Sequence, residues 1–245
     1  MSKKPSQDNI FALPLADIAD FVFDKQVVDV FPDMINRSVP GYSTIINIIG
    51  VLAQQYAQAD TRLYDLGCSL GAASLSMRHR ITEENCEIIA VDNAQAMIER
   101  FNKVIERDNS KTPVHTLCDD IQNIDIRNAS VAVMNFTLQF IPLEERKNIL
   151  MKIYNGLNVG GCFILSEKLA FTDNNENETQ IDLHHAFKKS NGYSDLEIAQ
   201  KRSALEKVLL PENKETHIQR LKETGFSQVY PWFQCFNFAS FIAIK

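Results

Sequence analysis

The chain has 245 residues, 45% hydrophobic and 23% charged, which is ordinary for a globular protein and enough for one sizeable core. No apolar run reaches the roughly 20 residues that a membrane-spanning helix needs, so we expect no contact with a membrane. The formal net charge is −6, and the basic clusters at residues 3–4, 188–189 and 201–202 are short. Proteins that bind nucleic acid directly normally carry a broad basic surface, so we expect a small-molecule substrate instead.

The N-terminal residues include lysines but no apolar stretch or small-residue cleavage site of the kind found in export signals. The five cysteines are widely spaced and form no CxxC pair. This pattern is typical of reduced thiols, because disulfides persist mainly in oxidising compartments. We therefore expect a cytoplasmic protein.

Residues 1–50 carry aromatic side chains, among them Phe11 and Phe21, and we expect them to form an N-terminal cover. From residue 63 onward, short apolar runs alternate with amphipathic patterns. They predict strands at residues 63–66, 87–91, 114–117, 130–135 and 162–166, and helices at 72–80, 95–108 and 143–157. We expect residues 158–161 to end the last of these helices, because glycine tolerates a left-handed turn. Such alternation predicts a parallel sheet that is covered on both faces.

Residues 168–212 interrupt this alternation. The insertion begins with the polar sequence TDNNENETQ, which has the composition of a disordered loop, and continues with helical patterns at 181–190 and 195–209. An insertion after the fifth strand lies over the carboxyl edge of the sheet, where open α/β folds bind ligands. We expect it to shape a substrate pocket. A role in dimerisation or packing is the alternative, and the two roles are compatible.

The C-terminal part predicts a helix at 215–224, closed by Gly225, and two aromatic-rich strands separated by residues 234–237. The short connection predicts an antiparallel pair at the edge of the sheet. The result is an α/β, Rossmann-like fold with a mostly parallel seven-stranded sheet and an antiparallel C-terminal strand, which resembles the class I methyltransferase fold. We expect residues 1–245 to form a single domain of this kind, with the N-terminal cover and the helical insertion added to it.

The loop after the first strand has the pattern D-x-G-x-x-x-G over residues 65–71. The dinucleotide fingerprint G-x-G-x-x-G fails, because Ser69 and Ala72 occupy glycine positions, and the lysine of a P-loop is absent. What remains is a backbone that passes close to a ligand and opens a helix whose positive end suits a carboxylate. This favours the amino-acid end of S-adenosylmethionine, although a glycine loop alone is a weak signal.

Asp92 ends the second strand, 25 positions after Gly67. A carboxylate there faces the glycine loop and can accept two hydrogen bonds from vicinal ribose hydroxyls. The alternative is that Asp92 is a helix N-cap, although Asn93 could cap the helix instead. The loop and the aspartate together favour a cofactor that contains adenosine.

The third and fourth strands also end in polar groups. After the third strand, Asp120 could accept from an adenine amino group while Ile121 lies against the ring, but turn chemistry explains the aspartates at 119–120 equally well. Residues 135–140 follow the fourth strand, where methyltransferases place catalytic groups, and lack the N-P-P-[YF] signature of enzymes that methylate nucleic-acid amino groups. We predict no metal site, because the histidines at 184–185 are adjacent and point about 100° apart on a helix.

The whole chain resembles the bacterial carboxy-S-adenosyl-L-methionine synthase family. The resemblance is carried by FPDMINRSVPGYS at residues 31–43, DLGCSLGAASLS at 65–76, NFTLQFIP at 135–142, FKKSNGYSDLEIAQKRSALE at 187–206 and WFQCFNFAS at 232–240. Members of the family convert S-adenosyl-L-methionine and prephenate into carboxy-S-adenosyl-L-methionine and phenylpyruvate. A separate tRNA carboxymethyltransferase uses this product to modify the wobble uridine of certain tRNAs to 5-oxyacetyl uridine. The resemblance also implies a homodimer.

By this resemblance, ten positions contact the cofactor: Tyr42, Gly67, Cys68, Ser69, Asp92, Asn93, Asp120, Ile121 and Asn135, with Arg202 gripping the added carboxylate. A guanidinium near a sulfonium is repelled by it in a water-poor pocket, so an arginine there makes sense only with an anion between them. A carboxylate of prephenate or of the product would be that anion. Without the resemblance, Arg202 reads more naturally as part of a solvated helix face.

The family reaction needs no general base from the protein. Prephenate aromatises, losing carbon dioxide and its ring hydroxyl; the departing hydroxide can take a proton from the sulfonium methyl, whose carbon then captures the carbon dioxide. The protein supplies positioning and exclusion of water. We assign no catalytic residue, and we consider Arg37 and Tyr42 candidates for holding prephenate, with structural roles as the alternative.

Two other functions are open on the sequence alone. One is a conventional S-adenosylmethionine-dependent methyltransferase that acts on RNA or a small molecule, which the acidic net charge disfavours for RNA. The other is a module that binds S-adenosylmethionine without turnover.

Overall fold

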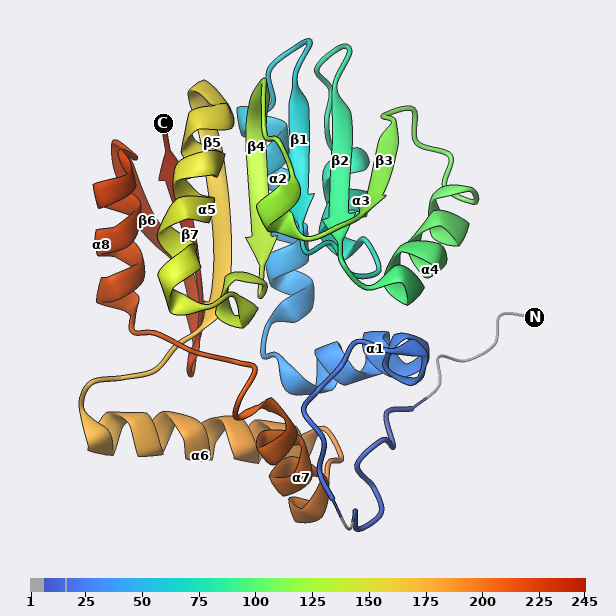
Figure 1. Ribbon diagram of the computed structural model, residues 1–245, viewed down its shortest axis with the longest axis vertical. Coiled ribbons are helices and arrows are strands. Elements are labelled where there is room, and N and C mark those ends of the chain that lie inside the picture. The colour runs from blue at the N-terminus through green and yellow to red at the C-terminus, as the bar shows by residue number, and fades with distance from the viewer. Residues whose placement is uncertain (1–6, 16) are drawn as a thin grey trace.

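The computed structural model describes residues 7–15 and 17–245 and is built around one seven-stranded sheet of order β3-β2-β1-β4-β5-β7-β6 (Figure 1). The strands are β1 (Arg62–Leu66), β2 (Glu87–Asp92), β3 (Val114–Cys118), β4 (Ala129–Asn135), β5 (Leu157–Lys168), β6 (Gln228–Cys235) and β7 (Phe238–Ile244). Within the described residues β7 alone runs antiparallel, pairing with β5 on one side and β6 on the other. The predicted α/β, Rossmann-like fold with a mostly parallel sheet and an antiparallel C-terminal strand is confirmed.

Helices cover both faces of the sheet. The described helices are α1 (Lys25–Ser38), α2 (Tyr42–Tyr56), α3 (Ala72–Arg78), α4 (Gln95–Ile105), α5 (Leu143–Gly156), α6 (Asn174–Ser190), α7 (Asp195–Leu205) and α8 (Lys214–Thr224), with short 3-10 turns η1 (Ile121–Asn123) and η2 (Leu138–Phe140). α2, α3 and α4 pack on one face, and α5 and α8 pack on the other. Within these residues, no helix combines the length and the apolar character needed to cross a lipid bilayer.

The central strand β4 shows why the sheet is covered twice. Its residues are buried from Ala129 to Met134, so the strand reads as a continuous apolar run rather than an alternating one. Val131 and Val133 pack in the cluster that includes α2, whereas Ala132 and Met134 pack in the cluster that includes α5. The predicted bounds of β1 to β4 differ from the observed ones by one residue at most.

The end of α5 differs from the prediction. The helix stops at Gly156, and the chain enters β5 at once, so residues 158–161 do not form a helix cap. Gly156 is packed so tightly that a Cβ there would lie 2.3 Å from the carbonyl oxygen of Ile126. Gly160, with φ +78°, instead lies in the irregular first part of β5, where the register with β4 shifts. α3 and α4 also end earlier than predicted, at Arg78 and Ile105.

The N-terminal region has two parts rather than one cover. α1 lies below the carboxyl ends of the strands, close to α6 and α7 in Figure 1. α2 is a layer of the core, because Ile45, Ile49 and Ala53 on one of its faces are fully buried against the sheet. The predicted boundary at residue 50 therefore falls inside a core helix, and the lysines at residues 3–4 lie outside the described residues.

The insertion is more helical than its composition suggests. α6 begins at Asn174, within the sequence that we expected to be a disordered loop, and the side chain of Asp173 caps it by accepting from the backbone N–H of Glu176. α7 is shorter than predicted, since it ends at Leu205. A bridge between Leu169 and Glu212 holds the two ends of the insertion together.

A buried arginine fixes the place where the insertion returns to the core. Arg146 of α5 has no exposed surface, and its guanidinium donates to the carbonyl oxygens of Ile141 and Leu210 and pairs with Glu212. These bonds tie the loop after β4 to the chain that leaves α7, so Arg146 sets the position of the insertion relative to the sheet.

The C-terminal prediction is largely confirmed. α8 ends at Gly225, whose φ of +119° is the left-handed conformation expected of a glycine cap. β6 and β7 form the predicted antiparallel pair. The connection is shorter than expected, because β6 continues to Cys235 and only Phe236 and Asn237 separate the strands.

Candidate functional site

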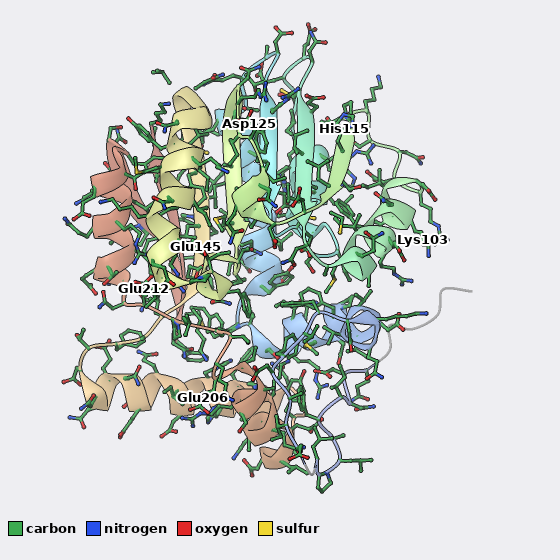
Figure 2. All side chains as sticks on the ribbon, viewed as in Figure 1. Lys103, His115, Asp125, Glu145, Glu206 and Glu212 are labelled. Atoms are coloured by element: carbon green, nitrogen blue, oxygen red, sulfur yellow. The ribbon has the colours of Figure 1, made fainter. Side chains whose placement is uncertain are left out.

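A cavity of about 640 Å³ lies at the carboxyl ends of the strands, between the sheet and the insertion. All ten predicted cofactor-binding positions line it: Tyr42, Gly67, Cys68, Ser69, Asp92, Asn93, Asp120, Ile121, Asn135 and Arg202. Figure 2 shows the side chains around this region. Glu206 is labelled at the end of α7, and Glu212 is labelled on the segment that leads from α7 to α8. The volume is within the usual range for small-molecule sites.

The glycine loop after β1 is held in a conformation that few other sequences could adopt. Gly67 and Gly71 have φ of +84° and +79°, and Ser69 has φ of +50°. A Cβ on Gly71 would lie 1.9 Å from the ring of Phe101, and one on Gly67 would lie 2.3 Å from the side chain of Thr137. These glycines are therefore required for packing against α4 and the segment after β4, in addition to any approach of a ligand.

Asp92 connects the glycine loop to the start of α4. Its carboxylate accepts from the backbone N–H groups of Ser69, at 2.8 Å, and Ala94, at 2.9 Å. Neither of the predicted caps is used, because the N-cap of α4 is Ala94. Asn93 instead donates to Asp120 at 2.8 Å, which links the ends of β2 and β3. Each oxygen of Asp92 keeps a lone pair for a further donor.

The half of the cavity next to the sheet is acidic. We call it the acidic half; its carboxylates are Asp65, Asp92, Asp119 and Asp120. None of them forms an ion pair within the described residues. Burial raises the pKa of Asp65 to about 6, despite the hydrogen bonds that its carboxylate accepts from Ser74, and burial also raises the pKa of Asp92. A positively charged ligand would relieve this cost, so the acidic half suits a cation.

Two further groups fit S-adenosylmethionine in this half. The Oδ1 atom of Asn135, at the end of β4, is buried and accepts no hydrogen bond within the described residues. An amino group of a ligand in the cavity could supply the missing donor. Burial, with a smaller contribution from Asp65, raises the pKa of Tyr42, so this phenol stays neutral and can donate.

Aromatic side chains close the cavity from the N-terminal side. Phe23 makes edge contacts with Phe21, Phe31 and Phe140, at ring-centroid distances of 5.1, 6.2 and 5.6 Å. These four rings all line the cavity and come from the N-terminal segment, α1 and η2. They give the cavity an apolar wall that limits the access of water.

The half of the cavity next to the insertion is cationic. We call it the cationic half; it carries Lys168 at the end of β5, Lys188 on α6, and Lys201 and Arg202 on α7. Among these four cations, only Arg202 was predicted from the sequence to bind a ligand. A signal for Lys188 was present, because residues 181, 184, 185 and 188 are spaced so that they share one helix face, and all of them line the cavity.

The two histidines of α6 are neutral members of this half. Burial, together with the charges of nearby lysines, lowers the pKa of His184 to about 3, and the same causes also lower the pKa of His185. His184 donates from Nε2 to the carbonyl oxygen of Ser38 at 2.8 Å, and its ring packs against Phe238 at 4.9 Å. His184 therefore joins α6 to α1 and β7, and the charge of the cationic half comes from its lysines and Arg202.

Arg37, a sequence-based candidate for holding prephenate, does not line the cavity. Its guanidinium donates to the backbone of Asn191 at 2.8 Å, pairs with Asp33 at 3.0 Å and stacks over the ring of Tyr193 at 3.8 Å. These contacts fasten α1 to the turn between α6 and α7. That candidate role was wrong, because the donors of Arg37 already hold the protein together.

Comparison with known proteins connects this site to a family. The sequence matches a methyltransferase-domain family model over residues 63–161. The carboxy-S-adenosyl-L-methionine synthase of Photobacterium profundum is 58% identical over 239 residues, covering 98% of each chain, and that of Trichlorobacter lovleyi is 58% identical over 246 aligned residues, covering 100% of each. The structure of an O-methyltransferase family protein from Burkholderia thailandensis superposes with a TM-score of 0.64 at 15% identity, covering 91% of this chain and 60% of that one, which shows a shared fold alone.

Proposed function

Since the chain belongs to the carboxy-S-adenosyl-L-methionine synthase family, we propose that it converts S-adenosyl-L-methionine and prephenate into carboxy-S-adenosyl-L-methionine and phenylpyruvate. The observation that carries the proposal is the division of one cavity into an acidic and a cationic half. S-adenosylmethionine carries a sulfonium and an ammonium group, and prephenate carries two carboxylates. One cavity thus offers each substrate an environment of opposite charge.

In the acidic half, each polar group matches a group of S-adenosylmethionine. Asp92 would accept from the ribose hydroxyls, Asp120 from the adenine amino group, and Asn135 from the ammonium group. Ile121 would lie against the adenine ring, and the glycine loop with Cys68 would follow the amino-acid end. These assignments rest on the placement of the residues around the cavity and on their free acceptors.

In the cationic half, Arg202 would hold the carboxylate that is transferred. The reaction converts the sulfonium methyl and the ring carboxylate of prephenate into a carboxymethyl group, and the ring hydroxyl leaves as water with the methyl proton. Carbon dioxide must stay in place between release and capture, so the site must orient both substrates and exclude water. The aromatic wall formed by Phe21, Phe23 and Phe140 is suited to that task.

Mass spectrometry of the reaction tests this proposal. Purified protein incubated with S-adenosylmethionine and prephenate should form a product about 44 mass units heavier than S-adenosylmethionine, the mass of one added carbon dioxide. A conventional methyltransferase would instead leave S-adenosylhomocysteine when given its acceptor, and a binding module would return S-adenosylmethionine unchanged. Absence of the heavier product would refute the proposed synthase activity.

We also propose where the product is used, where the reaction takes place and how the protein assembles. We expect the product to supply a tRNA carboxymethyltransferase that modifies wobble uridine, and we expect the reaction to take place in the cytoplasm, where tRNA is available. We also propose a homodimer. Light scattering coupled to size-exclusion chromatography should give twice the mass of the 27.8 kDa chain, and a monomeric mass would contradict it.

A further inference from the structure

Two lysines of the cavity, Lys168 and Lys188, carry positive charges that no carboxylate among the described residues pairs with. Lys188 lies on α6 with 6% of its surface exposed, and Lys168 lies at the end of β5, where its backbone N–H donates to Gln139 at 2.9 Å. Both line the cavity. Within the described residues, neither Nζ atom forms a hydrogen bond or an ion pair.

Lys201 makes a useful contrast because it lines the same cavity and is equally buried. Its Nζ lies 3.7 Å from Asp8 and 3.2 Å from the hydroxyl of Ser38, and Asp8 also accepts from the hydroxyl of Tyr193. Its charge is therefore shared with a buried carboxylate of the N-terminal segment, and it holds that segment against α7. Within the part of the chain that the structure describes, neither Lys168 nor Lys188 has a carboxylate partner of this kind. The Nζ atom of Lys188 lies 5.6 Å from the centroid of the Tyr193 ring, a weaker contact than an ion pair.

An uncompensated buried ammonium group destabilises a protein. Burial lowers the pKa of Lys168. Burial, together with the charges of Lys201 and Lys168, lowers the pKa of Lys188 to about 7. Asp8 and Glu197 oppose this shift at Lys188 but do not cancel it. The protein thus compensates the buried positive charge only in part, and an anionic ligand in the cavity would compensate the rest.

The positions of these lysines separate them from Arg202. Arg202 is exposed at the opening of the cavity on α7, whereas Lys188 is buried on α6. Arg202 is nevertheless close enough for its charge to lower the pKa of Lys168. The cationic half therefore presents cations at two places in one cavity, Arg202 on α7 and the two lysines on β5 and α6, and a ligand with two carboxylates could pair with both.

We propose that Lys168 and Lys188 form a subsite for the 2-oxo-carboxylate of prephenate, the carboxylate that remains on phenylpyruvate, while Arg202 holds the carboxylate that is transferred. This inference rests on the proposed function, since it assigns the second carboxylate of the substrate named there. It makes the site selective for dicarboxylates over monocarboxylates. It also makes phenylpyruvate a ligand of the two lysines after the transferred group has gone.

The test uses phenylpyruvate itself as the probe, measured by isothermal titration against full-length protein saturated with S-adenosylhomocysteine. Lys188→Met and Lys168→Met remove the charge and keep most of the side-chain volume. Each should weaken phenylpyruvate binding by about ten- to a hundredfold, the loss expected for one charge-assisted hydrogen bond. Arg202→Met should leave phenylpyruvate binding within about threefold, because phenylpyruvate no longer has the carboxylate assigned to Arg202.

Lys189→Met is the matched control. Lys189 is the next residue of α6, but it is half exposed and pairs with Asp195 at the surface. This variant should bind phenylpyruvate as the unmodified protein does. Thermal unfolding of each variant checks the fold. Lys188→Met and Lys168→Met should melt at the same temperature as the unmodified protein or higher, because each loses a charge that is buried or partly buried and has no ion-pair partner among the described residues.

The outcomes separate this inference from the proposed function. Unchanged phenylpyruvate affinity in folded Lys188→Met and Lys168→Met would overturn the subsite, and so would failure of an active synthase to bind phenylpyruvate. If the protein instead forms no carboxylated product but binds phenylpyruvate through Lys188, the subsite stands and the proposed reaction falls.

Discussion

The two halves of the cavity are built in different ways. The carboxylates of the acidic half come from the ends of strands β1 to β3, and they accept hydrogen bonds that also fix the loops, as Asp92 does from the backbone of Ser69 and Ala94. The cationic half comes mainly from α6 and α7, and Lys188 has no such bond within the described residues. The first half is therefore part of the fold, whereas the second is added to it by the insertion.

This difference indicates which half determines the chemistry. Other proteins of this fold share the sheet, as the Burkholderia thailandensis structure shows at 15% identity. A sheet edge with a glycine loop and a strand-end aspartate is a general site for an adenosine ligand. Cations opposite that site would attract an anionic second substrate. The insertion is thus the part of the chain that suits this cavity to a carboxylate donor.

Arg202→Met should show the largest difference between the two halves of the cavity, because it should reduce the use of prephenate without weakening the binding of S-adenosylhomocysteine. Arg202 is exposed, and prephenate in the cavity would cover its guanidinium. Removing one partner of a charge pair that is covered in this way costs about 2–5 kcal/mol, so kcat/KM for prephenate should fall by roughly 30-fold to several thousandfold. Binding of S-adenosylhomocysteine, which depends on the acidic half, should stay within about twofold. Initial rates of carboxylated product and titration of S-adenosylhomocysteine measure the two quantities. Lys207→Met, on the exposed side of the same segment, is the control, and full activity in Arg202→Met would remove Arg202 from the proposed role.

Asp92→Asn should have the opposite effect, weakening the binding of S-adenosylmethionine while leaving the binding of phenylpyruvate nearly unchanged. It keeps the shape of the side chain but removes its charge and one acceptor, so affinity for S-adenosylmethionine should fall by about ten- to a hundredfold, equivalent to about 1–3 kcal/mol. Affinity for phenylpyruvate should change by less than about threefold. Asp125→Asn is a matched control, since Asp125 is exposed and lies outside the cavity. Equal loss for both ligands would show that the halves are not independent.

The pH dependence of stability should show a smaller effect that belongs to the cationic half. The pKa of Lys188 is about 7 in the folded protein and about 10.4 in an unfolded chain. Between these values the unfolded chain binds more protons, so the contribution of Lys188 makes the free energy of unfolding rise with pH from about 7 to about 10. Lys201, whose pKa burial lowers to about 8, adds in the same direction. Urea unfolding at several pH values measures this dependence. The free energy of unfolding of Lys188→Met should rise less steeply with pH than that of the unmodified protein, and an identical rise would contradict the lowered pKa of Lys188.

The acidic half could be predicted from the sequence because its residues follow simple rules of position. Asp92 and Asp120 come directly after apolar strands, and parallel strands bring their carboxyl ends to one edge. The same rule placed Asn135 at the end of β4. Local spacing was enough here, since the backbone that carries these side chains is the regular part of the fold.

The cationic half could not be predicted in the same way. The buried residues of α6 are His184 and Lys188, which are polar, so the helix has no apolar stripe in its sequence, and its first turns resembled a disordered loop. Lys201 resembled a solvated residue because the carboxylate that accompanies it, Asp8, is 193 positions earlier in the chain. Contacts of that range depend on how α1, α6 and α7 are assembled, and no local pattern encodes them.

The most direct test of the two-halves account is a crystal structure of the protein with S-adenosylhomocysteine and phenylpyruvate. The account predicts that the adenosine lies along Asp92 and Asp120, and that the phenylpyruvate carboxylate lies within about 4 Å of the Nζ atom of Lys188 or Lys168. Phenylpyruvate bound outside the cavity, or with its carboxylate on Arg202 and away from both lysines, would contradict it.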